Sequence, residues 1–250
     1  MMNEEPLVTV VTVAYNSADT IVTTIESVLN QTYKNIEYRI VDGASKDETV
    51  KIAAGYLERF EEAGKKLIIT SEPDKGIYDA MNKGIMASEG EIIGIINSDD
   101  WYEPEAVETA VKNYLEKGYD YFYADINLIK SNGQVIVKHS RPSKIATSRH
   151  WNHPTSFVTR KTYEDIGVFK CEGIHDDFEF FLRTIKAKKK IVIENKILAN
   201  FRTGGASNDK SFKKCKKRCK DRYKCYRDNG YSFLYLFECV GIEIAKWIIS

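Results

Sequence analysis

Apolar and polar positions change period along the first half of the chain in a way that predicts alternating strands and helices. Runs rich in β-branched residues have the composition of strands buried on both faces, and they occupy residues 7–15, 36–41, 66–70 and 91–96. Between these runs apolar residues recur at helical spacing, as in Ile21, Ile25, Val28 and Leu29. Strict alternation of strand and helix predicts a mostly parallel sheet with helices on both faces.

Local signals place the ends of these helices. Asn16 and Ser17 are expected to open the first helix. Ser45 followed by Glu48 has the spacing of a capping box, which predicts a helix over about residues 48–63. Two further helices are expected at residues 78–88 and after Glu103-Pro104-Glu105.

The pattern changes after about residue 118. Residues 119–129 and 134–139 flank Ser131-Asn132-Gly133, which is typical of a β-hairpin. A helix is expected over 177–187 and a short strand over 191–193. Beyond residue 205 the chain becomes basic and helical, with one narrow stripe of apolar and aromatic residues among the lysines and arginines: Phe212, Cys215, Cys219, Tyr223 and Tyr226.

Charge divides the chain into an acidic body and a basic tail. The net charge is +1, which implies no global electrostatic partner such as nucleic acid. Residues 206–250 nevertheless hold eleven Lys/Arg and five Asp/Glu, so the tail is expected to make contacts of its own. Five cysteines, with no leader peptide expected at the N-terminus, favour reduced thiols and a cytoplasmic location.

A polar residue follows each predicted strand of the first half. Asn16, Asp42 and Lys75 follow the first three strands, and Asp99-Asp100 follows the buried run 92–96. Because the carboxyl ends of parallel strands lie at one edge of a sheet, these side chains are expected to share a ligand crevice. Two adjacent carboxylates repel each other unless a cation or several donors neutralise them, which favours Mg²⁺ and a phosphorylated ligand. A simple polar turn is the alternative.

Four motifs in order resemble family 2 glycosyltransferases. The resemblance covers about residues 6–207 and is carried by Thr12–Asn16, Val41–Ser45, Glu72–Gly84 and Asn97–Asp100. It implies an inverting enzyme with the GT-A fold, in which a Rossmann-like, mostly parallel sheet is flanked by helices. It also implies a nucleotide-binding half over about 6–118 and an acceptor half over about 119–207, which together make a GT-A domain of residues 1–207. Residues 208–250 would form a basic amphipathic helical tail.

The resemblance implies roles for residues in the first half. Tyr15, Asn16 and Asp42 match donor-binding positions, with the base held by Tyr15 and Asp42. Lys75 lies in the loop that touches the base or diphosphate. Asp99 would face the ribose and Asp100 would hold Mg²⁺ or Mn²⁺. Asn97 stands where many members have the first Asp of the motif, so this chain departs from the family there.

In the second half, the start of the helix at 177 offers a catalytic base. Inverting transfer needs a carboxylate to accept the proton of the attacking hydroxyl, and Asp177 with Glu179 fits the family spacing. The adjacent Asp176 leaves the assignment of the base open. Alternatively, all three carboxylates only stabilise the helix by interacting with the positive N-terminal end of its dipole. His153 is expected to face the acceptor or the diphosphate. The loop containing Arg202, Gly204 and Gly205 resembles the segment that closes over the leaving diphosphate.

These features predict an enzyme that transfers a hexosyl or N-acetylhexosaminyl group, with a UDP-sugar as the expected donor. The acceptor would be a glycan or a lipid-linked saccharide in surface polysaccharide synthesis. Two alternatives stay open: a sugar nucleotidyltransferase and a non-catalytic nucleotide-sugar-binding protein. The absence of a GxGxxG motif after the first strand argues against a dinucleotide oxidoreductase. The basic tail, with apolar residues after 231, is expected to lie on the inner face of a membrane or to pack against protein.

Overall fold

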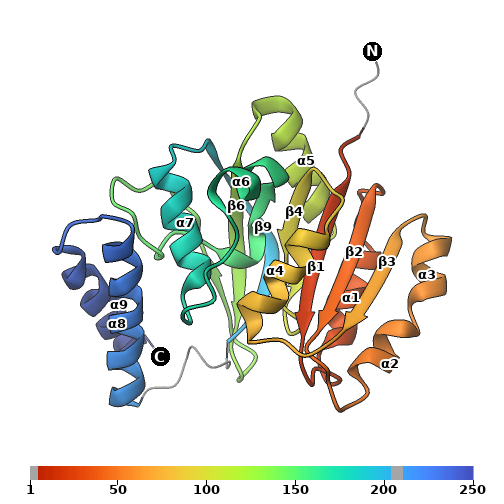
Figure 1. The fold of residues 1–250 in the computed structure, drawn as a ribbon, viewed down its shortest axis with the longest axis horizontal. Helices are drawn as coiled ribbons and strands as arrows, with labels where there is room; N and C mark the ends of the chain where they lie inside the picture. The colour runs from red at the N-terminus through yellow and green to blue at the C-terminus, as the bar shows by residue number, and fades with distance from the viewer. Residues whose placement is uncertain (1–4, 204–210, 250) are drawn as a thin grey trace.

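A computed structural model describes residues 5–203 and 211–249 of the chain. The first half alternates strand and helix (Figure 1), as the pattern predicts. Its elements are β1 (Val8–Ala14), α1 (Ile21–Leu29), β2 (Ile36–Asp42), α2 (Thr49–Ala54), α3 (Leu57–Glu62), β3 (Lys66–Ser71), α4 (Ile77–Ala87), β4 (Ile92–Ile95), β5 (Trp101–Tyr102) and α5 (Ala106–Lys117).

The second half begins with a hairpin and ends in two helices. Its elements are β6 (Tyr121–Ile129), β7 (Val135–Lys138), the 3₁₀ turn η1 (His153–Thr155), β8 (Phe157–Thr159), α6 (Arg160–Ile166), α7 (Asp176–Lys186), β9 (Ile191–Arg202), α8 (Phe212–Asp228) and α9 (Tyr235–Ile249). Within the described ranges, no helix has both the length and the apolar character needed to cross a membrane.

One mixed sheet joins the two halves. Its strand order among the described residues is β3-β2-β1-β4-β8-β6-β9-β5, and β7 pairs with β6 at the side. The pairs β1–β2, β1–β4 and β2–β3 are parallel, so the carboxyl ends of these four strands lie at one edge. β8 is antiparallel to both β4 and β6 and links the parallel half to the rest of the sheet.

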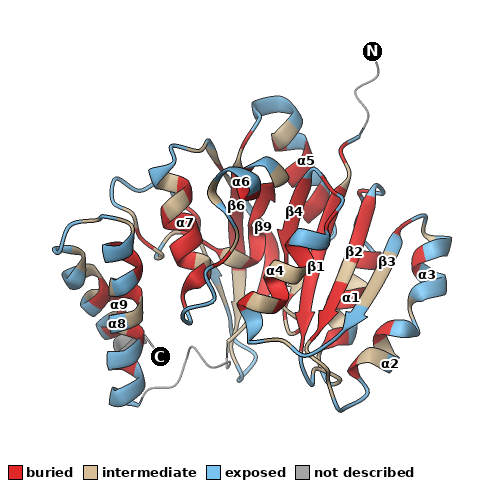
Figure 2. Ribbon diagram, viewed as in Figure 1, coloured by how far each residue is buried: buried red, intermediate tan, exposed pale blue. Residues whose placement is uncertain are grey.

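Helices cover both faces of the sheet, and each face has its own apolar core. Alternate residues of β1 point to opposite faces: Val8 and Val10 pack with α1, α3 and α5, whereas Val11 and Val13 pack with α4, α7 and α8. In Figure 2 the strands and the inward sides of the helices are buried, while the outward sides of the helices are exposed. This is the three-layer α/β architecture that the alternation predicts.

Several details of the predicted elements are wrong, and α1 begins at Ile21 rather than at Asn16-Ser17. The helix expected over 48–63 is split into α2 and α3 at Gly55-Tyr56. The capping box does not form, because the Ser45 hydroxyl bonds to Asp42 and the carboxylate of Asp47 accepts the Thr49 N–H at 3.0 Å instead. The strand expected over 191–193 extends as β9 to Arg202, because β6 pairs with it in parallel along most of its length.

The last two helices form an antiparallel pair beside α7. Arg218 and Arg222 of α8 meet Glu243 of α9, and Tyr226 stacks on Tyr235 with ring centroids 4.3 Å apart. Tyr226 and Phe178 of α7 lie edge to face at 5.5 Å, which joins the pair to the body. Figure 1 shows α8 and α9 at the end of the molecule next to α7. The tail is therefore helical, as expected, and both of its helices contact the body.

Candidate functional site

The ends of the first three strands meet around Gly43. A side-chain Cβ at this position would lie 2.4 Å from Asp74 Oδ2 and 3.3 Å from the Tyr15 ring. Tyr15 follows β1, Gly43 follows β2 and Asp74 follows β3, so three loops converge where glycine leaves room. The loops after these strands therefore lie together at one edge of the sheet, where the polar strand ends predict a ligand crevice.

The side chain of Tyr15 is exposed to solvent, and the hydrogen bonds of Asn16 fix the backbone beside it. The Tyr15 side chain is 60% exposed, whereas the residues of β1 before it are buried. Asn16 has a φ of 48° and bonds on both sides, since its N–H donates to Ser45 Oγ at 2.7 Å and its Oδ1 accepts the Lys46 N–H at 2.9 Å. An exposed aromatic ring on a fixed backbone is suited to stacking against a planar ligand.

Asp42 is fully buried at the end of β2 and has three donors. Its Oδ2 accepts the Ser45 N–H at 2.9 Å and the Ser71 hydroxyl at 2.7 Å, and its Oδ1 accepts the Ser45 hydroxyl. These hydrogen bonds fix the orientation of the carboxylate and link the ends of β2 and β3. Sequence patterns did not single out Ser45 or Ser71 for this contact, because serine beside a strand end is most often a turn residue.

Lys75 lies in an ordered turn before α4. The Asp74 carboxylate accepts the Gly76 N–H at 2.8 Å, and the Asp79 carboxylate accepts the Lys75 N–H at 3.0 Å. The Lys75 side chain is exposed. The turn thus presents a cation at the edge of the crevice while its own backbone N–H groups are satisfied.

Asp100 is the fully buried carboxylate beyond β4. Its Oδ1 accepts the Arg202 backbone N–H at 3.0 Å, and its Oδ2 has no hydrogen-bond partner among the described residues. Burial raises the pKa of Asp100 well above its usual value, and the neighbouring Asp99 raises it further. An unpartnered buried carboxylate oxygen is costly, which indicates a site for a cation or a donor.

The oxygen atoms around Asp100 suit a hard divalent cation. Asn97 Oδ1 is also buried without a partner in the described structure, so the departure from the family pattern still supplies an oxygen. Hydroxyls fix the backbone here, since Ser17 and Ser98 lie 2.8 Å apart and Thr24 donates to the Asp100 carbonyl at 2.6 Å. Among the described residues no group of three or more His, Cys, Asp or Glu could hold a metal. A cation here would need ligand oxygens from a bound diphosphate.

At the start of α7, the carboxylate of Asp177 accepts a hydrogen bond from a tyrosine hydroxyl. Its Oδ1 accepts the Tyr78 hydroxyl at 2.9 Å and the Phe178 N–H at 2.7 Å. Burial raises the pKa of Tyr78 well above its usual value, and Asp177 adds to this, so the phenol remains a hydrogen-bond donor. Tyr78 was not expected in the site, because its contact with Asp177 joins positions far apart in the sequence.

Asp176 and Glu179 have structural partners. Asp176 Oδ2 accepts the N–H groups of Glu172 and Gly173 at 2.6 and 3.1 Å. Glu179 is buried and forms ion pairs with Lys170 and Arg183, each at 2.9 Å. Both carboxylates line a separate cavity of about 30 Å³, on which Asp177 does not border. The structure therefore separates the three acidic residues that spacing could not distinguish.

A cavity of about 340 Å³ lies beside Asp177. Three of its lining residues carry buried polar atoms without a partner in the described part of the chain: Asn152 Oδ1, His153 Nε2 and Arg222 Nε. The Asn152 amide nitrogen donates to three oxygens, including the Ala124 carbonyl at 3.0 Å, which leaves its oxygen as an acceptor. Burial lowers the pKa of His153, although Asp177 partly offsets this. These groups suit a ligand that carries hydroxyls.

Strand β9 connects the lining of this cavity to Asp100. Phe201 lines the cavity, and the next residue, Arg202, donates its backbone N–H to Asp100. The Arg202 guanidinium lies 4.8 Å from the centroid of the Trp101 ring. Gly204 and Gly205, the other members of the expected diphosphate loop, lie outside the described residues.

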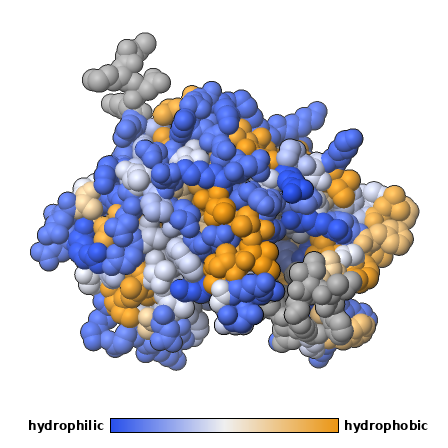
Figure 3. Space-filling model, turned by 180° about the vertical axis from the view of Figure 1, so that it is seen from behind, coloured by the Kyte–Doolittle hydropathy of each residue, from blue (hydrophilic) through white to orange (hydrophobic). Residues whose placement is uncertain are grey.

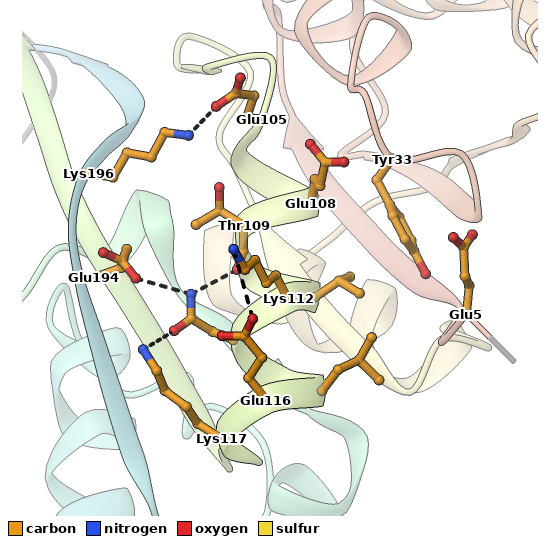
Figure 4. A pocket seen from close by; sticks show the side chains of 13 residues that line it. Glu5, Tyr33, Glu105, Glu108, Thr109, Lys112, Glu116, Lys117, Glu194 and Lys196 are labelled. Carbon is orange, nitrogen blue, oxygen red and sulfur yellow. Dashed lines mark hydrogen bonds and ion pairs between the residues drawn. The ribbon is translucent and has the colours of Figure 1, made fainter. Parts of the chain in front are cut away.

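The larger groove at α5 is not part of this site. It has a volume of about 760 Å³ and contains paired charges, among them Lys196–Glu105 and Lys112–Glu116 (Figure 4). Glu5 and Tyr33, which also line it, precede β1 and β2, so the groove lies at the amino ends of the parallel strands. Open α/β sheets bind ligands at the opposite edge.

A family model described as glycosyl transferase family 2 matches residues 9–178. The chain is 28% identical over 194 residues to a hyaluronan synthase of Pasteurella multocida, a match that covers 75% of this chain and 20% of that protein. It is 29% identical over 214 residues to an uncharacterised glycosyltransferase of Mycobacterium tuberculosis. This match covers 83% of this chain and 79% of that protein. The chain thus spans about a fifth of the hyaluronan synthase and most of the mycobacterial protein.

Solved structures show the same fold. TarS of S. aureus in complex with UDP matches with a TM-score of 0.65 and 19% identity, over 88% of this chain and 63% of that one. A mannosyltransferase from Pyrobaculum calidifontis in complex with GDP-Man and Mn²⁺ matches with a TM-score of 0.69 and 17% identity. The match covers 90% of this chain and 64% of that one.

Proposed function

The chain belongs to glycosyl transferase family 2, and from this premise we propose inverting transfer of a sugar from a nucleotide-sugar donor to a hydroxyl of a saccharide acceptor. The observation that carries the proposal is the placement of Asp177. One oxygen of its carboxylate is fixed by Tyr78, and the residue borders a cavity with unpartnered polar atoms. The other carboxylate oxygen is then available to an attacking hydroxyl.

We assign the donor to the crevice at the carboxyl ends of β1–β4. Tyr15 would stack on the base. Asp42 would accept a hydrogen bond from an N–H group of the base, which would compete with the serine hydroxyls for the carboxylate. Lys75 would contact the base or diphosphate, and Asp99 would bind the ribose. Asn16 would act indirectly, because both of its polar contacts hold the loop that carries Tyr15. UDP is the preferred nucleotide, since TarS is described in complexes with UDP and UDP-GlcNAc.

We place Mg²⁺ or Mn²⁺ on Asp100, with Asn97 as a second oxygen donor. The fit rests on the unpartnered buried oxygens Asp100 Oδ2 and Asn97 Oδ1. A divalent cation bound there would stabilise charge that develops on the leaving diphosphate. Arg202 would support the same charge from β9.

In this mechanism Asp177 accepts the proton of the acceptor hydroxyl as its oxygen attacks the anomeric carbon. The bond from that carbon to the diphosphate breaks on the opposite face, which inverts the configuration. Tyr78 orients the base through its hydroxyl. His153 lines the acceptor cavity and its pKa is lowered by burial, so it would present a neutral ring to the saccharide. Asp176 and Glu179 would hold the start of α7 rather than touch substrate.

The acceptor we propose is a glycan or a lipid-linked saccharide used in surface polysaccharide synthesis. Relatives described as hyaluronan synthase and chondroitin synthase support a polysaccharide product. We place the reaction on the cytoplasmic side of the membrane, where nucleotide sugars are available. A sugar nucleotidyltransferase is the second candidate for the same crevice, but it does not account for a carboxylate beside a separate polar cavity.

A panel of UDP- and GDP-sugars tests the proposal. Release of nucleoside diphosphate is measured with Mn²⁺, with Mg²⁺ and with a chelator, first as slow donor hydrolysis and then with saccharide acceptors. We expect one donor to turn over with metal, and we expect Asp177→Asn to abolish transfer to an acceptor. Glu172→Gln, on the exposed loop before α7, is the matched control and should retain activity. Absence of turnover and binding for every donor would refute the transferase.

A further inference from the structure

Helix α9 turns its described charged residues inward. Glu238 forms a bidentate pair with Arg149 of the body, with distances of 2.9 and 3.0 Å. Glu243 forms ion pairs with Arg218 and Arg222 of α8 at 2.8 and 3.2 Å, and its side chain is 9% exposed. The carboxylates that would make the outer side of this helix polar are therefore used inside the protein.

The outer side of α9 is apolar. Exposed positions of α9 and of the turn before it form a stripe at helical spacing, Phe233, Phe237, Val240 and Ile244, which are 65%, 73%, 41% and 55% exposed. Leu234 and Leu236 beside the stripe are 56% and 44% exposed. Figure 3 shows apolar atoms gathered at the edge of the molecule that these helices form. A soluble surface helix normally has the reverse arrangement, so this face is suited to an apolar partner.

Helix α8, which pairs with α9, carries exposed lysines. Lys213, Lys216, Lys217 and Lys220 are exposed on the outer side of α8, opposite Cys215, Arg218 and Arg222, which face inward. None of these four lysines forms an ion pair within 5–203 or 211–249. Residues 206–250 carry a net charge of +6 by composition. An apolar helix beside a cationic helix is the pattern of an interfacial membrane anchor.

We propose that the α8–α9 pair binds the surface of an anionic lipid bilayer, with the α9 stripe inserted among the acyl chains and the α8 lysines over the lipid headgroups. Charge complementarity selects this occupant. A second copy of the chain docked through the same face would bring two lysine-rich helices together, which like charges disfavour. The inference goes beyond sugar transfer and does not depend on it.

Co-sedimentation with lipid vesicles tests this surface. Full-length protein is mixed with vesicles of phosphatidylcholine alone or with phosphatidylglycerol added, at low and high salt. We expect binding to the anionic vesicles that weakens with salt. The double variant Phe233→Ser/Phe237→Ser should bind at least tenfold more weakly, and Lys216→Gln/Lys217→Gln should lose the preference for anionic lipid.

The control variant is Leu115→Ser, which removes a 52% exposed apolar side chain from α5 and should bind like the wild type. Circular dichroism checks that each variant is folded, and donor hydrolysis without lipid should be equal in all of them. The proposal is overturned if folded wild-type protein does not bind anionic vesicles at low salt. It is also overturned if the phenylalanine variant binds equally well, or abolishes a concentration-dependent dimer instead.

Discussion

At the scale of single residues, the hydroxyl of Tyr78 is the contact most specific to the proposed base. Replacing Tyr78 with Phe removes the 2.9 Å hydrogen bond to Asp177 and leaves the ring in its core. A hydrogen bond to a charged group contributes about 1.5–3 kcal/mol, so we expect kcat to fall about tenfold or more while KM for the donor is unchanged. Steady-state kinetics of the Tyr78→Phe variant measures both.

Tyr119→Phe is the control for that prediction. The Tyr119 hydroxyl is also buried, but it has no hydrogen-bond partner among the described residues, so its removal should leave kcat unchanged. If Tyr78→Phe turned over acceptor at the wild-type rate, orientation of Asp177 through this hydroxyl would be excluded.

Sequence reasoning found part of the candidate site residue by residue. It could name Asp100 and Asp177 because carboxylates at a strand end and at a helix start fall in recognisable motifs. It could not find Tyr78, Asn152 or Arg222, because what marks them is a contact across the fold or an atom left without a partner. Arg222 in particular lies in a run of basic residues that gives no sign which of them is buried.

At the scale of elements, α4 packs on β1 through a glycine. A Cβ at Gly84 would lie 2.4 Å from Val11 Cγ1, which is closer than packed carbon atoms tolerate. We expect Gly84→Val to lower the free energy of unfolding by about 1–3 kcal/mol or more through overpacking. Urea unfolding followed by circular dichroism measures this. Ala87→Val, at the exposed end of the same helix, should change stability by less than about 0.5 kcal/mol, and equal effects would contradict the packing argument.

Strand β2 contains a buried carboxylate that makes stability depend on pH. Burial alone raises the pKa of Glu37, but hydrogen bonds from Arg39, the Glu89 N–H and Thr9 outweigh it and lower the pKa to about 2 from 4.5. A folded-state pKa below the unfolded value gives stability that is complete above about 4.5 and is lost as pH falls towards 2.

Glu37→Gln removes that titration. The variant should be less stable than the wild type at neutral pH by up to about 3 kcal/mol, and the difference should shrink as pH falls through this window. Urea midpoints measured across the acid range test the sign. A difference that stayed constant with pH would show that Glu37 does not titrate as described.

The elements themselves were largely predictable, and the exceptions have physical reasons. Strong apolar periods located β1 to β4, α4 and α5 closely. The capping box is absent because Ser45 bonds to the Asp42 carboxylate within the turn after β2, and the helix is interrupted at Gly55. The length of β9 depends on pairing with β6, and β8 is a three-residue strand between β4 and β6 that no local pattern marks.

At the scale of the whole molecule, the C-terminal helices and the body share one core. Phe178, Cys225, Tyr226 and Cys239 belong to the same apolar cluster as Val11 of β1. Glu243→Ala would leave Arg218 and Arg222 buried without their carboxylate partner, so we expect a loss of about 3–5 kcal/mol.

Urea unfolding measures that loss by tryptophan fluorescence and by far-ultraviolet circular dichroism. Because the core is shared, both signals should shift together in Glu243→Ala. Separate transitions would show that α8 and α9 fold independently of the body.

The central claim is that the strand-end carboxylates hold a metal and a nucleotide, while Asp177 acts on the acceptor. Calorimetric titration of UDP and GDP, with and without Mn²⁺, tests it in the wild type, Asp100→Asn and Asp177→Asn. We predict Mn²⁺-dependent nucleotide binding that is lost in Asp100→Asn and retained in Asp177→Asn. Equal binding by all three proteins, or loss in Asp177→Asn alone, would contradict the account.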